Sequence, residues 1–158
     1  MSLLTRRRGF SRGVVSARAS ADRPVLLATL DVPFADDAIA FAVDSAVETG
    51  QRLLLVNAAE VLLTPSSLVG YGYVERPELQ DELRKPAELA ASLAVPVERL
   101  RLCSPHPVDA LVETVAEHNP SVLVFGPDPS RLERRRYRRA AKRILARVTC
   151  LVWLADPE

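Results

Sequence analysis

The sequence predicts an α/β fold: a single doubly wound domain with a five-stranded parallel sheet and helices on both faces. Short apolar runs alternate along the chain with segments of helical spacing. Several of these runs are continuously apolar, which is typical of strands buried on both faces. The connections between them are too long for hairpins, so parallel strands joined by helical crossovers are favoured.

The first half of the chain contains two of the five strands. The first is predicted over residues 23–31, where the apolar run VLLATL follows a proline. A helix follows over residues 34–50, with two aspartates in its first turn and Gly50 as its stop. Residues 52–58 form the second strand. The apolar stretch 60–73 is broken by proline and glycine, so we expect a long, partly packed loop there.

Helical spacing returns after this loop. It covers residues 77–94 and contains Pro86, so we expect a kink or two consecutive short helices. Residues 97–103 alternate between polar and apolar side chains, which indicates a strand near a sheet edge. The next helix lies within residues 104–120 and has a proline in its first turn.

The last three elements follow the same alternation. Residues 121–126 form the fourth strand, residues 134–148 the last helix and residues 150–155 the fifth strand. The apolar residues of this helix recur every three or four positions and should face the sheet. They are Tyr137, Ala140, Ala141, Ile144, Leu145 and Val148.

The net charge of +1 conceals a strong segregation of charge. Residues 1–23 carry six basic side chains and one acidic one, whereas residues 24–130 carry six basic and sixteen acidic ones. Residues 131–147 carry nine basic side chains against one acidic one. The chain is therefore predicted to have an acidic body, a basic arm and one very basic helix.

We predict two regions, a basic and flexible arm over residues 1–22 and one folded domain over residues 23–158. The Arg- and Ser-rich start also has the composition of an organelle transit peptide, which remains an alternative. Cys103 and Cys150 are too few for a disulfide framework and indicate a reducing compartment. No apolar run approaches ~18 residues. We therefore expect a cytoplasmic protein without a membrane segment.

Three stretches resemble the universal stress protein family, which the order of elements matches over about residues 23–156. They are VLLATLDVPFADDAIAFAVDSAVETGQRLLLVNA, SVLVFGPD and RILARVTCLVWLA. The resemblance implies a domain of the adenine-nucleotide-binding alpha hydrolase type with strand order 3-2-1-4-5. It also implies a homodimer joined through the last strand. Cys103 and Cys150 would then lie at opposite edges of the sheet, too far apart to form a disulfide.

The ATP-binding members of this family carry a glycine motif similar to G-x2-G-x9-G-[S/T] after strand four, and an aspartate that ends strand one. Gly126 matches the first glycine, but the second position holds Pro129. The last pair falls on Arg139 and Ala140, or one residue earlier when counted back from the last strand. Asp31 matches the aspartate after a shift of one residue.

The loop after strand four lacks the chemistry of a backbone phosphate cradle. Such a cradle needs consecutive N–H groups that face one point. Pro127 and Pro129 have no N–H, and Asp128 places a carboxylate where the phosphates would lie. At ~5 Å and an effective dielectric of ~20, its repulsion costs about 3 kcal/mol per unit of phosphate charge. The sequence therefore predicts that family-style ATP binding is lost.

Arginine side chains offer a second way to hold an anion. Arg131, Arg134 or Arg135 could supply guanidinium forks where backbone donors are missing, with a magnesium ion bridging Asp128 to the phosphates. Polar groups that end the first two strands would lie near the switch in strand order. The candidate nucleotide crevice thus comprises Thr29, Asp31, Asn57, Gly126, Arg131, Arg134 and Arg139.

The last helix is electrostatically unfavourable in isolation. It contains like-charged pairs four residues apart, such as Arg134/Arg138 and Arg138/Lys142, and each costs roughly 0.2–0.5 kcal/mol. This charge is expected to meet the acidic body, a dimer mate and solvent. The alternative is nucleic acid or another polyanion, bound together with the basic arm. No recognised nucleic-acid motif is present, and Tyr137 is the only aromatic residue of the basic stretch.

The two histidines have no second metal ligand at a suitable spacing. We expect His106 to cap a helix and His118 to lie near the end of the same helix. Ser104, His106 and Asp109 are close in sequence, but their position at a helix entry does not predict a catalytic relay. No catalytic residue is therefore predicted.

The sequence predicts a regulatory or binding protein similar to universal stress proteins, acting through protein contacts and without ATPase activity. We expect a homodimer, an unidentified protein partner and no cofactor. The first alternative is an adenine-nucleotide-binding member that holds ATP or AMP, with magnesium, by arginines in place of the glycine loop. The second alternative is a polyanion or nucleic-acid binder that uses the last helix and the arm.

Overall fold

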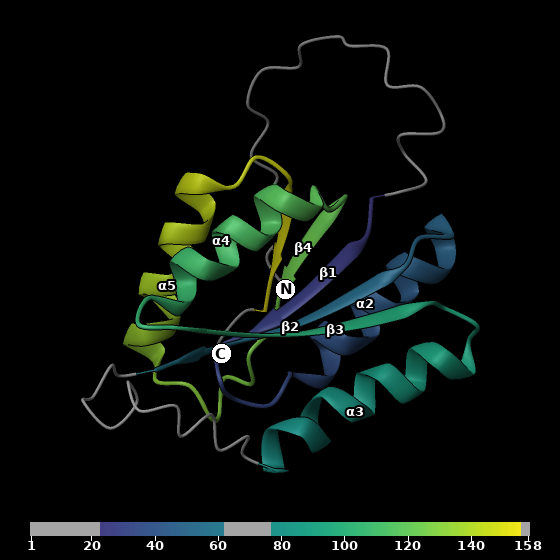
Figure 1. Cartoon of the computed structure of the whole chain (residues 1–158), viewed down its shortest axis with the longest axis horizontal. Helices are drawn as coiled ribbons and strands as arrows, with labels where there is room; N and C mark the ends of the chain where they lie inside the picture. The colour runs from purple at the N-terminus through teal and green to yellow at the C-terminus, as the bar shows by residue number, and fades with distance from the viewer. Residues whose placement is uncertain (1–22, 62–76, 156–158) are drawn as a thin grey trace, which may run out of the picture.

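Five parallel strands form the centre of the molecule in the order β3-β2-β1-β4-β5 (Figure 1). The computed structural model describes residues 23–61 and 77–155. This order confirms the predicted sheet and places the switch in strand order between β1 and β4. The strands are β1 (Val25–Thr29), β2 (Leu53–Glu60), β3 (Val97–Ser104), β4 (Val122–Phe125) and β5 (Leu151–Leu154).

Two helices cover each face of the sheet, as the doubly wound fold requires. The helices are α2 (Asp36–Thr49), α3 (Pro77–Ser92), α4 (Pro107–His118) and α5 (Arg134–Arg147). Buried side chains of α2 and α3 pack with one face, and those of α4 and α5 pack with the other. Figure 1 shows α4 and α5 running side by side over one face of the sheet.

Successive side chains of each inner strand pack into opposite layers of the core, one on each face of the sheet. In β1, Val25 and Leu27 contact the α2/α3 layer, whereas Leu26 and Ala28 contact the α4/α5 layer. All four side chains are fully buried. This two-sided burial explains why the strand reads as a continuous apolar run rather than an alternating one.

Pro86 does not divide the third helical segment into two helices. The structure has one helix, α3, from Pro77 to Ser92, with Pro86 inside it. A proline removes one backbone hydrogen bond of a helix. Here Leu83, Ala87 and Ala90 are buried in the core on either side of the proline, and this packing holds the helix together. Of the two predicted alternatives, the division into two short helices is therefore wrong, and the kink stays a prediction.

The second strand begins one residue later and ends two residues later than predicted, because β2 pairs with β3 as far as Glu60 and Ser104. The predicted arm over residues 1–22 and the predicted loop beyond Val61 lie outside the described residues. No helix in the described ranges is long and apolar enough to cross a membrane. Cys103 and Cys150 are free thiols at opposite edges of the sheet, as expected.

Candidate functional site

A cationic pocket of about 270 Å³ lies where α4 begins and α5 passes the carboxyl ends of β1 and β2. Open α/β sheets bind ligands at this edge, near the switch in strand order. Three guanidinium groups and one imidazole contribute to its lining, together with one carboxylate. The lining residues are Leu30, Glu60, Pro105, His106, Pro107, Val108, Arg136, Arg139, Ala140 and Arg143.

Helical spacing brings the three arginines of the pocket together. Arg136, Arg139 and Arg143 are three and four residues apart on α5 and therefore share one side of the helix. The apolar side of α5 is fixed against the sheet by Tyr137, whose ring stacks on Phe125 with centroids 5.5 Å apart. The packing of Tyr137 thus sets which arginines line the pocket.

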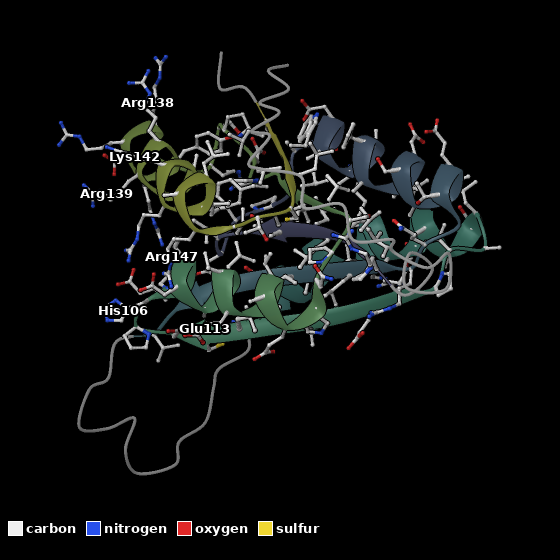
Figure 2. All side chains as sticks on the ribbon, turned by 90° about the horizontal axis from the view of Figure 1, so that it is seen from above. His106, Glu113, Arg138, Arg139, Lys142 and Arg147 are labelled. Atoms are coloured by element: carbon white, nitrogen blue, oxygen red, sulfur yellow. The ribbon has the colours of Figure 1, made fainter. Side chains whose placement is uncertain are left out.

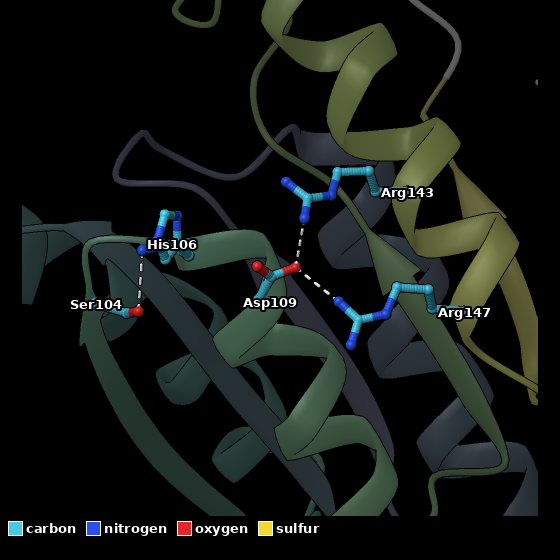
Figure 3. A network of polar contacts seen from close by, with 5 residues as sticks. All are labelled: Ser104, His106, Asp109, Arg143 and Arg147. Carbon is cyan, nitrogen blue, oxygen red and sulfur yellow. Dashed lines mark hydrogen bonds and ion pairs between the residues drawn. The ribbon is translucent and has the colours of Figure 1, made fainter.

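Acidic groups of the body neutralise some of these cations. Arg136 lies 3.7 Å from the carboxylate of Glu60. One carboxylate oxygen of Asp109, in the first turn of α4, accepts hydrogen bonds from Arg143 at 2.8 Å and Arg147 at 2.6 Å (Figure 3). Arg139 has no acidic partner among the described residues. It is therefore the uncompensated charge of the pocket.

The loop that follows β4 has no backbone donor left for a phosphate between residues 126 and 132. Pro127 and Pro129 lack an N–H, and Gly126 donates to the carbonyl of Ala28 at 3.0 Å. The other four amides bond within the loop region, mostly to Asp128. They are Asp128 N–H to Pro33, Ser130 N–H to the Asp128 carboxylate, and the N–H groups of Arg131 and Leu132 to the Asp128 carbonyl.

The loops after β1 and β4 are joined to each other. Ala35 donates to the carbonyl of Gly126 at 2.9 Å, and Asp128 donates to the carbonyl of Pro33 at 2.8 Å. A Cβ atom on Gly126 would lie 2.2 Å from the Cβ of Ala38 in α2. Gly126 is therefore needed here for the close approach of α2 to the end of β4.

The polar groups predicted at the ends of β1 and β2 organise the turn after β1. The Thr29 hydroxyl donates to the carbonyl of Val32 at 2.8 Å, and the Asn57 side-chain oxygen accepts from the Asp31 N–H at 2.8 Å. Both side chains are almost fully buried. Asp31 has a left-handed backbone with φ 56°, which aspartate tolerates better than most residues. Their predicted contact with a ligand remains a prediction.

Of the seven residues predicted for the crevice, Arg139 lines the pocket. Arg131 precedes α5 and Arg134 begins it, and both are exposed outside the pocket lining. Arg136 and Arg143 were not predicted as site residues, although their spacing from Arg139 is a usable signal. Glu60 and His106 carry no motif, and only the folded sheet brings them to α5.

The polar side chains of Ser104 and Asp109 have partners other than the imidazole of His106. The Ser104 hydroxyl accepts a hydrogen bond from the backbone N–H of His106 at 3.0 Å, and Asp109 is bonded to the arginines of α5 (Figure 3). His106 occupies the N-cap position of α4, but its side chain makes no capping hydrogen bond. The prediction that His106 caps this helix is confirmed for its position, where its backbone carbonyl accepts a hydrogen bond from the Ala110 N–H.

The two thiols are poor nucleophiles in this fold. Burial raises the pKa of the Cys103 thiol, and the nearby carboxylate of Asp31 raises it further. Burial also raises the pKa of the Cys150 thiol, against smaller opposing effects of hydrogen bonds and Arg23. Both thiols are therefore protonated at neutral pH. The described residues contain no group of three or more His, Cys, Asp or Glu side chains that could hold a metal ion.

The fold and the position of the pocket define a doubly wound α/β protein with a candidate ligand site at the carboxyl ends of β1 and β2. A family model of the universal stress protein family matches residues 23–155. The chain therefore belongs to the universal stress protein family. A search of curated proteins gives no significant match to this sequence.

Solved structures of universal stress proteins share this fold at low sequence identity. One from Archaeoglobus fulgidus, in complex with dAMP, has a TM-score of 0.58 and 14% identity, and the match covers 86% of this chain and 99% of that one. UspA from Lactobacillus plantarum has a TM-score of 0.60 and 16% identity, covering 85% and 99%. A family protein from Arabidopsis thaliana with AMP bound has a TM-score of 0.54 and 13% identity, covering 85% and 93%.

Proposed function

We propose that this protein is a non-catalytic, regulatory member of its family that binds an adenine nucleotide by arginine side chains. The observation that supports this proposal is the pocket lined by Arg136, Arg139 and Arg143, beside a loop whose backbone donors are all used. A phosphate in this pocket meets guanidinium groups instead of amides. Planar guanidinium forks match the oxygen geometry of phosphate.

The ion pairs of the pocket leave donors for a ligand. Each guanidinium group has five N–H donors, and Arg143 gives one hydrogen bond to Asp109. Arg139 has no acidic partner among the described residues, so its charge is available. Arg139 also occupies a position where the family motif has a glycine or a hydroxyl residue. A cation there supplies the interaction that the glycine loop has lost.

The size of the pocket favours a mononucleotide over ATP. Its volume of about 270 Å³ is below the range of about 300–1,000 Å³ that is usual for ligand pockets. The adenine preference is inferred from relatives, because solved family members carry dAMP and AMP. We propose AMP as the first ligand to test, with ATP and magnesium as the alternative.

Calorimetric titration with AMP tests the proposal. We expect binding by the full-length protein, and about 10- to 100-fold weaker binding after Arg139→Gln, because a charge-assisted hydrogen bond contributes about 1.5–3 kcal/mol. The matched control is Arg135→Gln, which removes the same charge from α5 outside the pocket lining. It should change the dissociation constant by less than about 3-fold, since Arg135 does not line the pocket and gives no hydrogen bond to a ligand there.

The absence of heat with AMP, cAMP and ATP, with or without magnesium, would refute nucleotide binding. Equal losses in the two variants would show that net charge, and not the pocket, holds the ligand. In either case the prediction of a role carried by protein contacts would remain. A check of the denatured protein for co-purified nucleotide completes this test.

We also propose that the protein forms a homodimer through β5. Among residues 23–61 and 77–155 this strand pairs only with β4 and forms one edge of the sheet, so its outer backbone groups face no other described strand and can meet a partner strand. Leu151 on this strand is 42% exposed, although it is a large apolar residue. An exposed apolar edge is a usual place for pairing between chains.

Sedimentation at micromolar concentration tests the homodimer. We expect a dimer for the natural sequence and a monomer for Leu151→Lys, because a charge on an edge strand opposes edge-to-edge pairing. Leu89→Lys is the matched control, since Leu89 has a similar exposure of 43% but lies on α3. A monomeric natural protein, or a dimer that Leu151→Lys leaves intact, would contradict the proposed interface.

A further inference from the structure

The outward face of α5 carries four exposed cations that the pocket does not use. This outer stripe consists of Arg134, Arg135, Arg138 and Lys142. None of them lines the pocket, and none makes an ion pair with an acid in the part of the chain that the structure describes. Figure 2 shows Arg138 and Lys142 extending from the helix away from the rest of the molecule.

The acidic body does not account for this stripe. In the described part of the chain, the ion pairs of the body with α5 reach only Arg136, Arg143 and Arg147, through Glu60 and Asp109. The first turn of α5 contains no acidic residue, so cations there also oppose the helix dipole. Glu133, which is exposed at the N-cap of α5, is the one acid of residues 131–147, and it makes no ion pair with the stripe among the described residues. The outer stripe thus keeps an excess of positive charge.

The chemistry of the stripe distinguishes between kinds of anionic partner. A protein interface normally has an apolar or aromatic centre. The large apolar side chains exposed in the described residues are Val47, Leu89, Leu93 and Leu151, and none of them belongs to α5. Binding of single-stranded nucleic acid relies on aromatic rings on which bases stack. The one aromatic residue of α5, Tyr137, is only 5% exposed and packs against the sheet.

We propose that the outer stripe of α5 binds the phosphate backbone of double-stranded DNA without reading its base sequence. Arg134 and Lys142 are about 12 Å apart along the helix axis, from a rise of 1.5 Å per residue. A DNA duplex carries one phosphate charge per ~1.7 Å of its axis, so this length faces several phosphates. The chain contains no recognised DNA-reading motif, and contacts to phosphates carry no sequence information.

Fluorescence anisotropy with a labelled 20-base-pair duplex, at 50 to 200 mM NaCl, tests this proposal on the full-length protein. The test variant is Arg135→Gln/Arg138→Gln/Lys142→Gln. Each lost phosphate contact lowers the slope of log affinity against log salt by about 1, so the slope should fall by about 2–3. We expect at least about 10-fold weaker binding at 100 mM NaCl, equally for duplexes of two different sequences.

The matched control is Arg52→Gln/Arg84→Gln/Lys85→Gln, which removes two arginines and one lysine from elsewhere on the surface. These three residues form ion pairs with Glu98, Glu88 and Asp36. The control should keep its DNA affinity within about 3-fold and its salt slope unchanged. Affinity for AMP should be unchanged in the test variant, which separates this surface from the proposed pocket.

Four results would overturn the proposal. Two of them are the absence of binding to duplex DNA at 50 mM NaCl and equal losses of DNA affinity in the test and control variants. The other two are tighter binding to a single strand of the same length, and competition by polyglutamate that is as effective as competition by unlabelled duplex. The last two would assign the stripe to another kind of polyanion. The test variant should fold normally, because it removes repulsion between like charges on one helix.

Discussion

Gly126→Ala should destabilise the protein by about 2 kcal/mol, within the range of about 1–3 kcal/mol for an overpacked core. The new Cβ would lie 2.2 Å from the Cβ of Ala38, which is attached directly to the backbone of α2. The helix must therefore move as a whole. Its first turn is tied to the loop by the hydrogen bond from Ala35 to the Gly126 carbonyl. Urea unfolding of the natural and variant proteins measures the loss.

A double-mutant cycle shows whether this steric contact is the cause. Ala38→Gly alone should cost about 1 kcal/mol, since glycine is less favourable than alanine inside a helix. The double variant should lose at least about 1 kcal/mol less stability than the sum of the two single losses. The reason is that Ala38→Gly removes the Cβ atom with which the new Cβ of Gly126→Ala would clash. Strict additivity would show that Gly126 and Ala38 do not conflict.

The same variant separates a structural from a ligand-binding role of this glycine. In the family motif the first glycine belongs to the nucleotide loop, but here both backbone groups of Gly126 are bonded within the fold. We therefore expect Gly126→Ala to leave the dissociation constant of AMP within about 3-fold, measured at a temperature where the variant is folded. A large loss of AMP affinity with unchanged stability would show that Gly126 belongs to the phosphate-binding site.

Tyr137→Ala should cost about 3–5 kcal/mol of stability, the usual loss for a buried aromatic residue. The Tyr137 ring packs on Phe125, and its hydroxyl donates a hydrogen bond to the carbonyl of Ala155. This side chain holds α5 on the sheet although like charges along the helix repel one another. Urea unfolding followed by circular dichroism measures the loss.

The conservative change Tyr137→Phe divides this effect into two parts. It keeps the ring and removes the hydroxyl. We expect the free energy of unfolding to fall by about 1–2 kcal/mol, because one hydrogen bond is lost and the buried carbonyl that accepted it has no donor. AMP affinity should survive in Tyr137→Phe, because the ring still sets the rotation of α5. Equal losses of stability in both variants would mean that the ring contributes little and the hydroxyl dominates.

The sequence was sufficient to predict the layers and the parallel sheet, because strands that are buried on both faces consist of continuous apolar runs. The end of β2 was not predictable in the same way. Glu60 belongs to the strand because it pairs with Ser104 of β3, and that register is not visible within β2 itself. Pro86 was misleading because its local cost is offset by burial of α3 in the core.

The candidate site was only partly predictable for related reasons. Arg139 was found by aligning a motif, and its neighbours at helical spacing could have been found in the same way. Glu60 and His106 could not, since sheet order alone brings their segments to α5. The polar groups Thr29 and Asn57 were placed at the right edge, but their bonds to the backbone depend on the turn after β1.

The central claim is that side chains of α5, and not the loop after β4, hold the phosphate of a bound nucleotide. A crystal structure of the full-length protein with AMP tests it most directly. We expect the phosphate oxygens within hydrogen-bonding distance of the guanidinium group of Arg139, with the hydrogen bonds of residues 126–132 unchanged. A phosphate bound by the backbone N–H groups of residues 126–132, after those bonds have opened, would contradict the claim.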